Sequence, residues 1–277
     1  MSILTIAHLT FLEARRRKLF WIVLVVGLLA LVLFSLGFYF MYQDLPQTGP
    51  NAALIRTEFS NVLLLMSLYG VNSLGVMLAV LISADTIAGE IASGTIQTVV
   101  TKPLRRWEVV LGKWLGLAGM LAVFEAAMSA GMMAVVWTLS GYVPEHPFQG
   151  VGLMVLSGLV FLTISILGGT RLPTLGNGVL AFMLYGVAFV GGWVEQIGAL
   201  VHSDTAVNIG IAVSLLVPGE TLWRRAAYLL QPPVLGEVTF TPFGTSSAPS
   251  EAMVVYSLAY VAVLLTAAVL LFQRRDL

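Results

Sequence analysis

Cysteine is absent from this chain of 277 residues, and charged residues are scarce. Without thiols, disulfides and thiolate metal ligands are excluded. Charged side chains make up 10% of the sequence, whereas soluble domains contain about 25%. The formal net charge is zero and the three histidines lie far apart in the sequence. Nothing therefore indicates a nucleic-acid partner or a metal site, and we expect neither.

Several catalytic signatures are also missing. The sequence has no G-x-x-x-x-G-K-[ST] motif for nucleotide phosphates, and its one Gly-Lys pair, Gly112-Lys113, is followed by Trp114. Neither H-E-x-x-H nor G-x-S-x-G occurs, and the apolar runs hold no pair of acids. These absences disfavour an intramembrane enzyme, and any ATPase that drives this protein has to be a separate chain.

Apolar residues, by contrast, dominate the chain. Hydrophobic residues make up 58% of it and the mean hydropathy is +0.93. A bilayer crossing needs about 20 apolar residues, and lipid requires helices because it cannot satisfy an exposed backbone. We therefore predict an all-α membrane protein with one domain over residues 1–277. Its six predicted transmembrane helices lie near Leu19–Met41, Asn61–Ala84, Val109–Leu139, Val151–Gly168, Val179–Val201 and Ala252–Phe272.

The positions of the basic residues predict the orientation of these spans. If the N-terminus is cytoplasmic, eleven of the 14 lysines and arginines lie on the cytoplasmic side. Only Arg56, Arg224 and Arg225 then lie outside, which agrees with the excess of positive charge in cytoplasmic segments. We therefore expect a multi-pass protein of the plasma or inner membrane with both termini in the cytoplasm.

The first 18 residues are too short to cross a bilayer before the first span begins. They combine apolar positions with a polar cluster at their end. That pattern is typical of a helix that lies in the interface, with its bases near lipid headgroups. The cluster consists of Glu13, Arg15, Arg16, Arg17 and Lys18.

The outer region, residues 202–250, contains a second short apolar run. Val207–Val217 is too short for a crossing and is followed by Pro-Gly, so we predict a re-entrant or interfacial piece. Glu220–Leu230 then predicts a short amphipathic helix with Arg224 and Arg225 on its solvent face. The rest of the region is rich in Pro, Gly, Ser and Thr and is predicted to be a loop.

The largest cytoplasmic segment is the loop at residues 85–107. Gly94 and Pro103 predict a helix, a break and a second short helix. Within this loop Glu90 has two interpretations. It pairs with Lys102 or Arg106 and stabilises the loop, or it holds the loop against a gate or a partner protein.

The stretch "AGEIASGTIQTVVTKPLRRWEVVLGKWLG" resembles the signature loop of the type-2 ABC exporter permeases. The N-terminal "AHLTFLEARRRKLFW" and the outer "LLVPGETLWRRAAYLL" are similar to that family's interfacial helix and re-entrant region. Chain length and short outer loops look most similar to the permeases tied to nitrous oxide reductase maturation. The positions that match the loop signature are Asp85, Gly89, Glu90, Gly94, Thr95, Pro103, Arg106, Gly112 and Lys113.

The resemblance implies partners and a mechanism. Such permeases pair with a second permease copy, identical or not, and recruit a separate cytoplasmic ATPase. That ATPase binds ATP and magnesium, so no cofactor is expected in this chain. The loop is then a coupling helix seated on the ATPase. The residues expected to take part in coupling are Asp85, Gly89, Glu90, Gly94, Thr95, Lys102, Pro103, Arg105 and Arg106.

The function expected from this resemblance is export of a hydrophobic or amphipathic substrate by alternating access, without catalysis by this chain. One alternative is an ATP-driven complex that transmits force to an extracytoplasmic partner or matures it. A second alternative is a secondary transporter that works without ATP. Such transporters usually carry several polar groups at mid-depth, whereas the spans here are nearly uncharged.

Glu125 lies midway along the third predicted span. An ionisable group at that depth costs about 2.5–3.5 kcal/mol on the translocon scale. It is either a pathway or gating residue, or it is held by a hydrogen bond from a nearby Ser or Thr. On the same span Gly112 and Gly116 predict close helix packing, against a helix of the same chain or of a second copy.

Overall fold

The computed structural model describes residues 3–92, 105–232 and 249–274, and all regular secondary structure within them is helical. Six of the helices are long and apolar enough to cross a membrane, which confirms the predicted all-α membrane fold. The transmembrane helices are α2 (Lys18–Gln43), α3 (Ala52–Ala92), α5 (Arg106–Ser140), α6 (Pro147–Gly169), α7 (Thr174–Leu200) and α10 (Glu251–Gln273).

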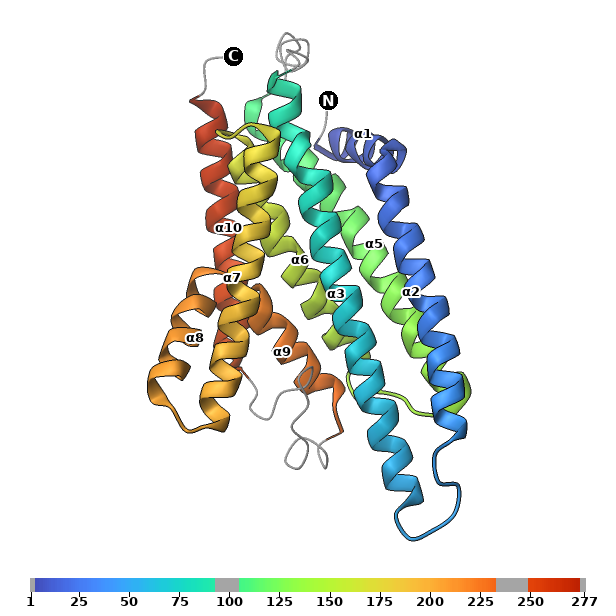
Figure 1. Cartoon of the computed structure of the whole chain (residues 1–277). Coiled ribbons are helices and arrows are strands. Elements are labelled where there is room, and N and C mark those ends of the chain that lie inside the picture. Colours follow the sequence, from blue (N-terminus) through green and yellow to red (C-terminus); the bar gives the residue numbers. More distant parts are fainter. Residues whose placement is uncertain (1–2, 93–104, 233–248, 275–277) are drawn as a thin grey trace.

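The described ends of the chain lie at the same end of the bundle, as an even number of spans requires (Figure 1). We call this the inner end, following the orientation predicted from the basic residues, and the opposite one the outer end. The inner end carries the junction of α1 and α2 and the last turns of α3. The connection between α2 and α3 lies at the outer end (Figure 1).

Helix α3 corrects the predicted boundary of the second span. It has 41 residues, which at 1.5 Å per residue is about 60 Å, roughly twice the hydrocarbon thickness of a bilayer. The predicted span ended at Ala84 with a loop from Asp85, but residues 85–92 continue the helix. A helix can continue through charged residues when their side chains form ion pairs with neighbouring segments. Asp85 and Glu90 both do so, with Arg17 and Lys113. The remainder of the predicted loop, up to residue 104, lies outside the described residues.

Helix α1 (Ile3–Arg16) lies across the inner end and packs on α5 (Figure 1). Two glycines of α5 make this close approach feasible. A Cβ added at Gly116 would lie 2.4 Å from the Ala7 carbonyl oxygen, and one at Gly112 would lie 2.6 Å from Ile6 Cβ. The predicted glycine contact is therefore made within the same chain, and it fixes the interfacial helix to the bundle.

The region predicted to be re-entrant contains α8 (Asp204–Leu216) and α9 (Gly219–Leu230), which meet at a bend of 106°. Pro218 follows an extended Val217, because a residue before proline is disfavoured in the helical conformation. The hydroxyl of Tyr260 on α10 donates to the carbonyl oxygen of Leu216 at 2.9 Å, close to this bend. The bend is thus anchored to the last span.

The prediction that Arg224 lies on the solvent face of α9 is wrong. Its side chain is buried, with 4% of the residue exposed, and its Nη2 lies 2.7 Å from Glu195 Oε2 on α7. Ser214 on α8 is also within 3.5 Å of the same nitrogen. Because the acid comes from another helix, the pattern of α9 alone could not show that Arg224 has a buried partner. This ion pair links α7, α8 and α9.

Candidate functional site

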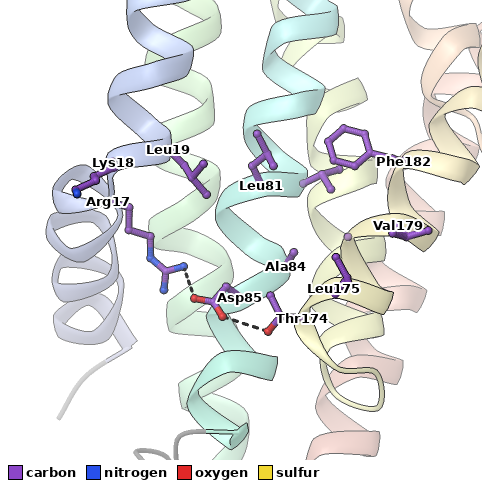
Figure 2. A pocket seen from close by; sticks show the side chains of 12 residues that line it. Arg17, Lys18, Leu19, Leu81, Ala84, Asp85, Thr174, Leu175, Val179 and Phe182 are labelled. Atoms are coloured by element: carbon purple, nitrogen blue, oxygen red, sulfur yellow. Dashed lines mark hydrogen bonds and ion pairs between the residues drawn. The ribbon is translucent and has the colours of Figure 1, made fainter.

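Asp85 is the centre of one polar cluster at the inner end. Arg17 Nη1 donates to its Oδ2 at 3.1 Å, and Thr174 Oγ1 donates to its Oδ1 at 3.1 Å (Figure 2). Arg17 also pairs with Glu13 of α1 at 2.9 Å. These contacts connect α3 to the junction of α1 and α2 and to the start of α7. Asp85 thus joins three segments that are far apart in sequence.

Glu90 forms a second polar link, one turn further along α3. Lys113 Nζ on α5 donates to Glu90 Oε1, and also to the Thr86 carbonyl oxygen at 3.4 Å. The side chain of Lys113 is only 7% exposed and that of Glu90 is 20% exposed. Lys113 is thus one partner of Glu90. The sequence predicted Lys102, which lies outside the described residues, or Arg106 as its partner. Asp85 and Glu90 therefore connect α3 to the start of α2, to α5 and to α7.

The other predicted coupling residues lie near this cluster or outside the described residues. Gly89 leaves room for the carboxylate one turn before it, since an added Cβ would lie 2.0 Å from Asp85 Oδ1. Arg105 precedes α5, and its backbone N–H donates to Glu108 Oε2 at 3.1 Å. Arg106 donates to the Gln273 carbonyl oxygen of α10 at 3.0 Å. Outside the described residues are Gly94, Thr95, Lys102 and Pro103.

The basic residues of the predicted interfacial helix separate into two groups. Arg17 turns inward and is half-buried in its contacts with Asp85 and Glu13, whereas Arg15, Arg16 and Lys18 are exposed. Arg17 also sits between α1 and α2 in an extended conformation. It therefore connects the interfacial helix to the bundle, while the exposed bases are free to face lipid headgroups.

A cavity of about 720 Å³ lies beside the Asp85 cluster, between the start of α2, the inner half of α3 and the start of α7. Its polar edge is formed by Arg17, Lys18, Asp85 and Thr174 (Figure 2). The other lining residues are mostly apolar, including Phe182 on α7. A cavity with one polar edge and apolar walls matches an amphipathic molecule. We call it the inner cavity.

Glu125 lies in the centre of the bundle, away from the inner cavity. It is fully buried on α5, and a Cβ added at Gly75 of α3 would lie 1.7 Å from its Oε1. Neither carboxylate oxygen has a hydrogen-bond partner among the described residues. The expected hydrogen bond from a nearby Ser or Thr is thus not seen, and Ser129 instead directs its hydroxyl toward Met154 Sδ at 4.0 Å. Glu125 is an isolated buried carboxyl group.

Sequence reasoning missed three of the side chains that complete these arrangements. Thr174 carried no signal beyond its place at the start of a helix, and Lys113 was matched to the loop signature without a partner. Glu195 was not considered, although an acid in the fifth span required a partner. Each contact joins helices that are distant in sequence. The sequence could therefore show that a buried charge needs a partner, but not which residue that partner is.

The fold and the site define a polytopic helical membrane protein with a short N-terminal helix across its inner end, a long second span and a polar cluster at that end. The sequence matches the family described as ABC-2 family transporter protein over residues 4–277, and the chain belongs to this family. Membrane subunits of this family work with a cytoplasmic ATPase, so the chain is a transporter membrane component. No curated protein matches the chain.

Proposed function

We propose that this chain is the permease subunit of an ABC exporter that moves a hydrophobic or amphipathic substrate by alternating access. A separate ATPase binds ATP and magnesium and engages the cytoplasmic segment between α3 and α5. Membership of the ABC-2 family supports the permease assignment. The observation that carries the proposal is the pair of acids in the last turns of α3, each of which connects that helix to its neighbours.

The cluster suggests how a push on the segment after α3 reaches the membrane. Helix α3 is continuous over 41 residues, so a force at its inner end moves the whole helix rather than a flexible loop. Asp85 holds it to Arg17 and Thr174, and Glu90 holds it to Lys113. A displacement of α3 therefore has to carry α2, α5 and α7 with it or break these pairs. Two packed arrangements related by such a shift are what alternating access requires.

The substrate class follows from the inner cavity. Its walls are apolar and its polar edge carries both a cation and an acid, so it favours an amphiphile over a strongly charged solute. Because α3 forms one wall and α2 and α7 form the others, the same displacement of α3 changes the shape of the cavity. Coupling and substrate binding thus share residues of α3.

Four further features belong to the same proposal. The termini are cytoplasmic, the permease acts as a dimer, and the outer region contacts an extracytoplasmic partner. Membership of the nitrous oxide reductase maturation subgroup is a finer prediction than the family match. The excess of basic residues at the inner end supports the orientation.

Co-purification tests the proposal. The tagged protein is isolated from its native membranes, and the amount of bound ATPase and its rate of ATP hydrolysis are measured. We expect a stoichiometric ATPase with the natural chain. Glu90→Gln should release the ATPase or change its hydrolysis rate, since the carboxylate that holds Lys113 is lost. Glu58→Gln removes an acid near the outer end of the same helix and is the matched control.

Two results would contradict the proposal. One is a natural chain that purifies from native membranes without any ATPase and transports its substrate alone. The other is a Glu90→Gln variant that matches both the natural chain and Glu58→Gln in bound ATPase and in hydrolysis. Folding of the variants is checked by their elution profile and helix content, so that loss of the ATPase is not confused with loss of the fold.

A further inference from the structure

A second cavity, of about 490 Å³, lies at the outer end of the bundle. It is enclosed by the end of α2, the first turns of α3 and the segment that follows α5. Its lining is rich in polar side chains, including Gln47, Thr57, Ser60 and Tyr142. Among the described residues that line it, Arg56 is the only charged one. We call it the outer cavity, and it shares no lining residue with the inner cavity.

Arg56 has no acidic partner among the described residues, unlike three other arginines of the chain. Arg17, Arg224 and Arg225 each pair with an acid. The guanidinium of Arg56 has neither an ion pair nor a hydrogen bond among the described residues, and its Nε is buried without a partner. A buried donor without an acceptor is destabilising, because it has lost water and gained nothing in return. The site therefore lacks an acceptor.

The position of the guanidinium is fixed by aromatic packing. Its central carbon lies 4.3 Å from the centroid of the Tyr42 ring, a cation–π contact. Tyr42 in turn stacks on Phe38, with ring centroids 5.5 Å apart. A planar guanidinium that rests one face on a ring still presents its N–H edge, and that edge suits the paired oxygens of a phosphate or carboxylate.

The surrounding side chains also favour an oxyanion. Gln47 and Thr57 line the cavity, and neither side chain forms a hydrogen bond within the described part of the chain, so both can donate to a ligand. The hydroxyl of Tyr142 is already engaged, since it donates to Asn61 Oδ1 at 3.1 Å. No acidic side chain is among the described residues that line the cavity, and the charged side chain found among them is the cationic Arg56.

We propose that the outer cavity binds an oxyanion of the phosphate class, with Arg56 as its anchoring residue. The anion accepts from the guanidinium edge and from the free donors of Gln47 and Thr57. The cavity lies where α2 ends and α3 begins, at the outer surface predicted for the bilayer. A phospholipid headgroup and a soluble phosphate both carry the required chemistry. This site is separate from the Asp85 cluster at the inner end, and binding there does not depend on the ATPase.

The test uses the full chain in a maltoside detergent, which carries no phosphate, and compares the two sources of phosphate. Thermal unfolding midpoints are measured in the detergent alone, with added inorganic phosphate, and with added phosphatidylglycerol. Arg56→Gln removes the anchor, and Arg56→Lys keeps the charge but not the planar edge. Arg225→Gln is the matched control, because it removes the same charge from the same end outside the cavity.

We expect a rise in the midpoint of the natural chain with one or both phosphate sources. Arg56→Gln should bind about tenfold or more weakly, the factor that corresponds to about 1.4 kcal/mol. Arg56→Lys should recover part of the affinity, and Arg225→Gln should respond like the natural chain. A response to inorganic phosphate in the detergent identifies a soluble ligand, and a response to phosphatidylglycerol alone identifies a lipid.

Three results would overturn the assignment. The natural chain responds to neither source, or Arg56→Gln responds as fully as the natural chain, or Arg225→Gln loses the response to the same extent. The last result would mean that general positive charge at the outer end attracts the anion. Native mass spectrometry of bound phosphatidylglycerol provides a readout that does not depend on stability. A folding defect in Arg56→Gln is therefore distinguishable from a loss of binding.

Discussion

The packing of α1 on α5 gives the sharpest prediction, because α5 also contains a glycine that makes no such contact and serves as the control. A methyl group added at Gly116 would lie 2.4 Å from the Ala7 carbonyl oxygen and 2.9 Å from Thr10 Cβ. A methyl group at Gly119, less than one turn away, would meet nothing within 4 Å. The backbone of α1 cannot yield as a flexible side chain would. Gly116→Ala should therefore push α1 away from α5, and Gly119→Ala should leave it in place.

The magnitude follows from comparing the two variants. Alanine is favoured over glycine inside a helix by up to about 1 kcal/mol, and both variants gain this amount. Overpacking a close contact costs about 1–3 kcal/mol, and only Gly116→Ala incurs it. In the difference between the variants the helix term cancels. The free energy that holds α1 on the bundle should thus be lower by about 1–3 kcal/mol in Gly116→Ala, a factor of about 5–150 in the opening equilibrium.

Hydrogen exchange of the α1 amides, followed by mass spectrometry in nanodiscs, measures this opening. We expect peptides from residues 3–16 to exchange about 5- to 150-fold faster in Gly116→Ala than in Gly119→Ala. Peptides from the buried helix α6 should exchange equally in both variants. Equal exchange of α1 in the two variants would refute the packing argument, and with it the view that α1 is fixed to the bundle by this glycine contact.

Three other predictions concern the buried charges and the orientation. Glu125→Met should raise the thermal unfolding midpoint, because an unpaired buried polar group costs about 1–3 kcal/mol. A lower midpoint would contradict this and show that Glu125 has a partner. Full transport by Glu125→Gln would exclude a pathway role. Arg224→Gln should lower the midpoint more than Arg225→Gln, since Arg224 is 4% exposed and its acid Glu195 is 21% exposed, whereas the acid paired with Arg225 is 88% exposed; equal effects would contradict this. A thiol reagent that cannot cross membranes should label His202→Cys but not Arg105→Cys in intact cells, and the reverse pattern would invert the topology.

Much of the fold could be predicted because lipid imposes strong rules on sequence. Runs of about 20 apolar residues fixed the number of spans, and the break before Pro218 indicated the outer bend. The end of the second span was wrong because Asp85 and Glu90 were taken as the start of a loop. Both carboxylates pair with bases from elsewhere in the bundle, Arg17 between α1 and α2 and Lys113 on α5, and α3 continues to Ala92. Hydropathy along one helix contains no information about such partners.

The candidate site was predictable only in part, for the same reason. The loop signature selected Asp85 and Glu90, yet their partners come from α5, α7 and the junction of α1 and α2. Arg224 shows the limit most clearly. On α9 alone it belongs to the polar face and looks solvated, but Glu195 meets it from α7. Charge pairs between helices depend on tertiary packing, and periodicity within one helix cannot supply it.

In the proposed mechanism, ATP bound by a partner protein moves the spans around the inner cavity. The natural chain has no cysteine, so two spin labels can be placed without further changes. Leu19 on α2 and Leu175 on α7 both line the cavity and are exposed. The distance between labels at these sites is measured by pulsed electron spin resonance, in the complex with its ATPase, with and without trapped nucleotide. We expect two distance distributions that interchange with nucleotide. A single distribution unaffected by ATPase and nucleotide would contradict ATP-driven movement of these spans.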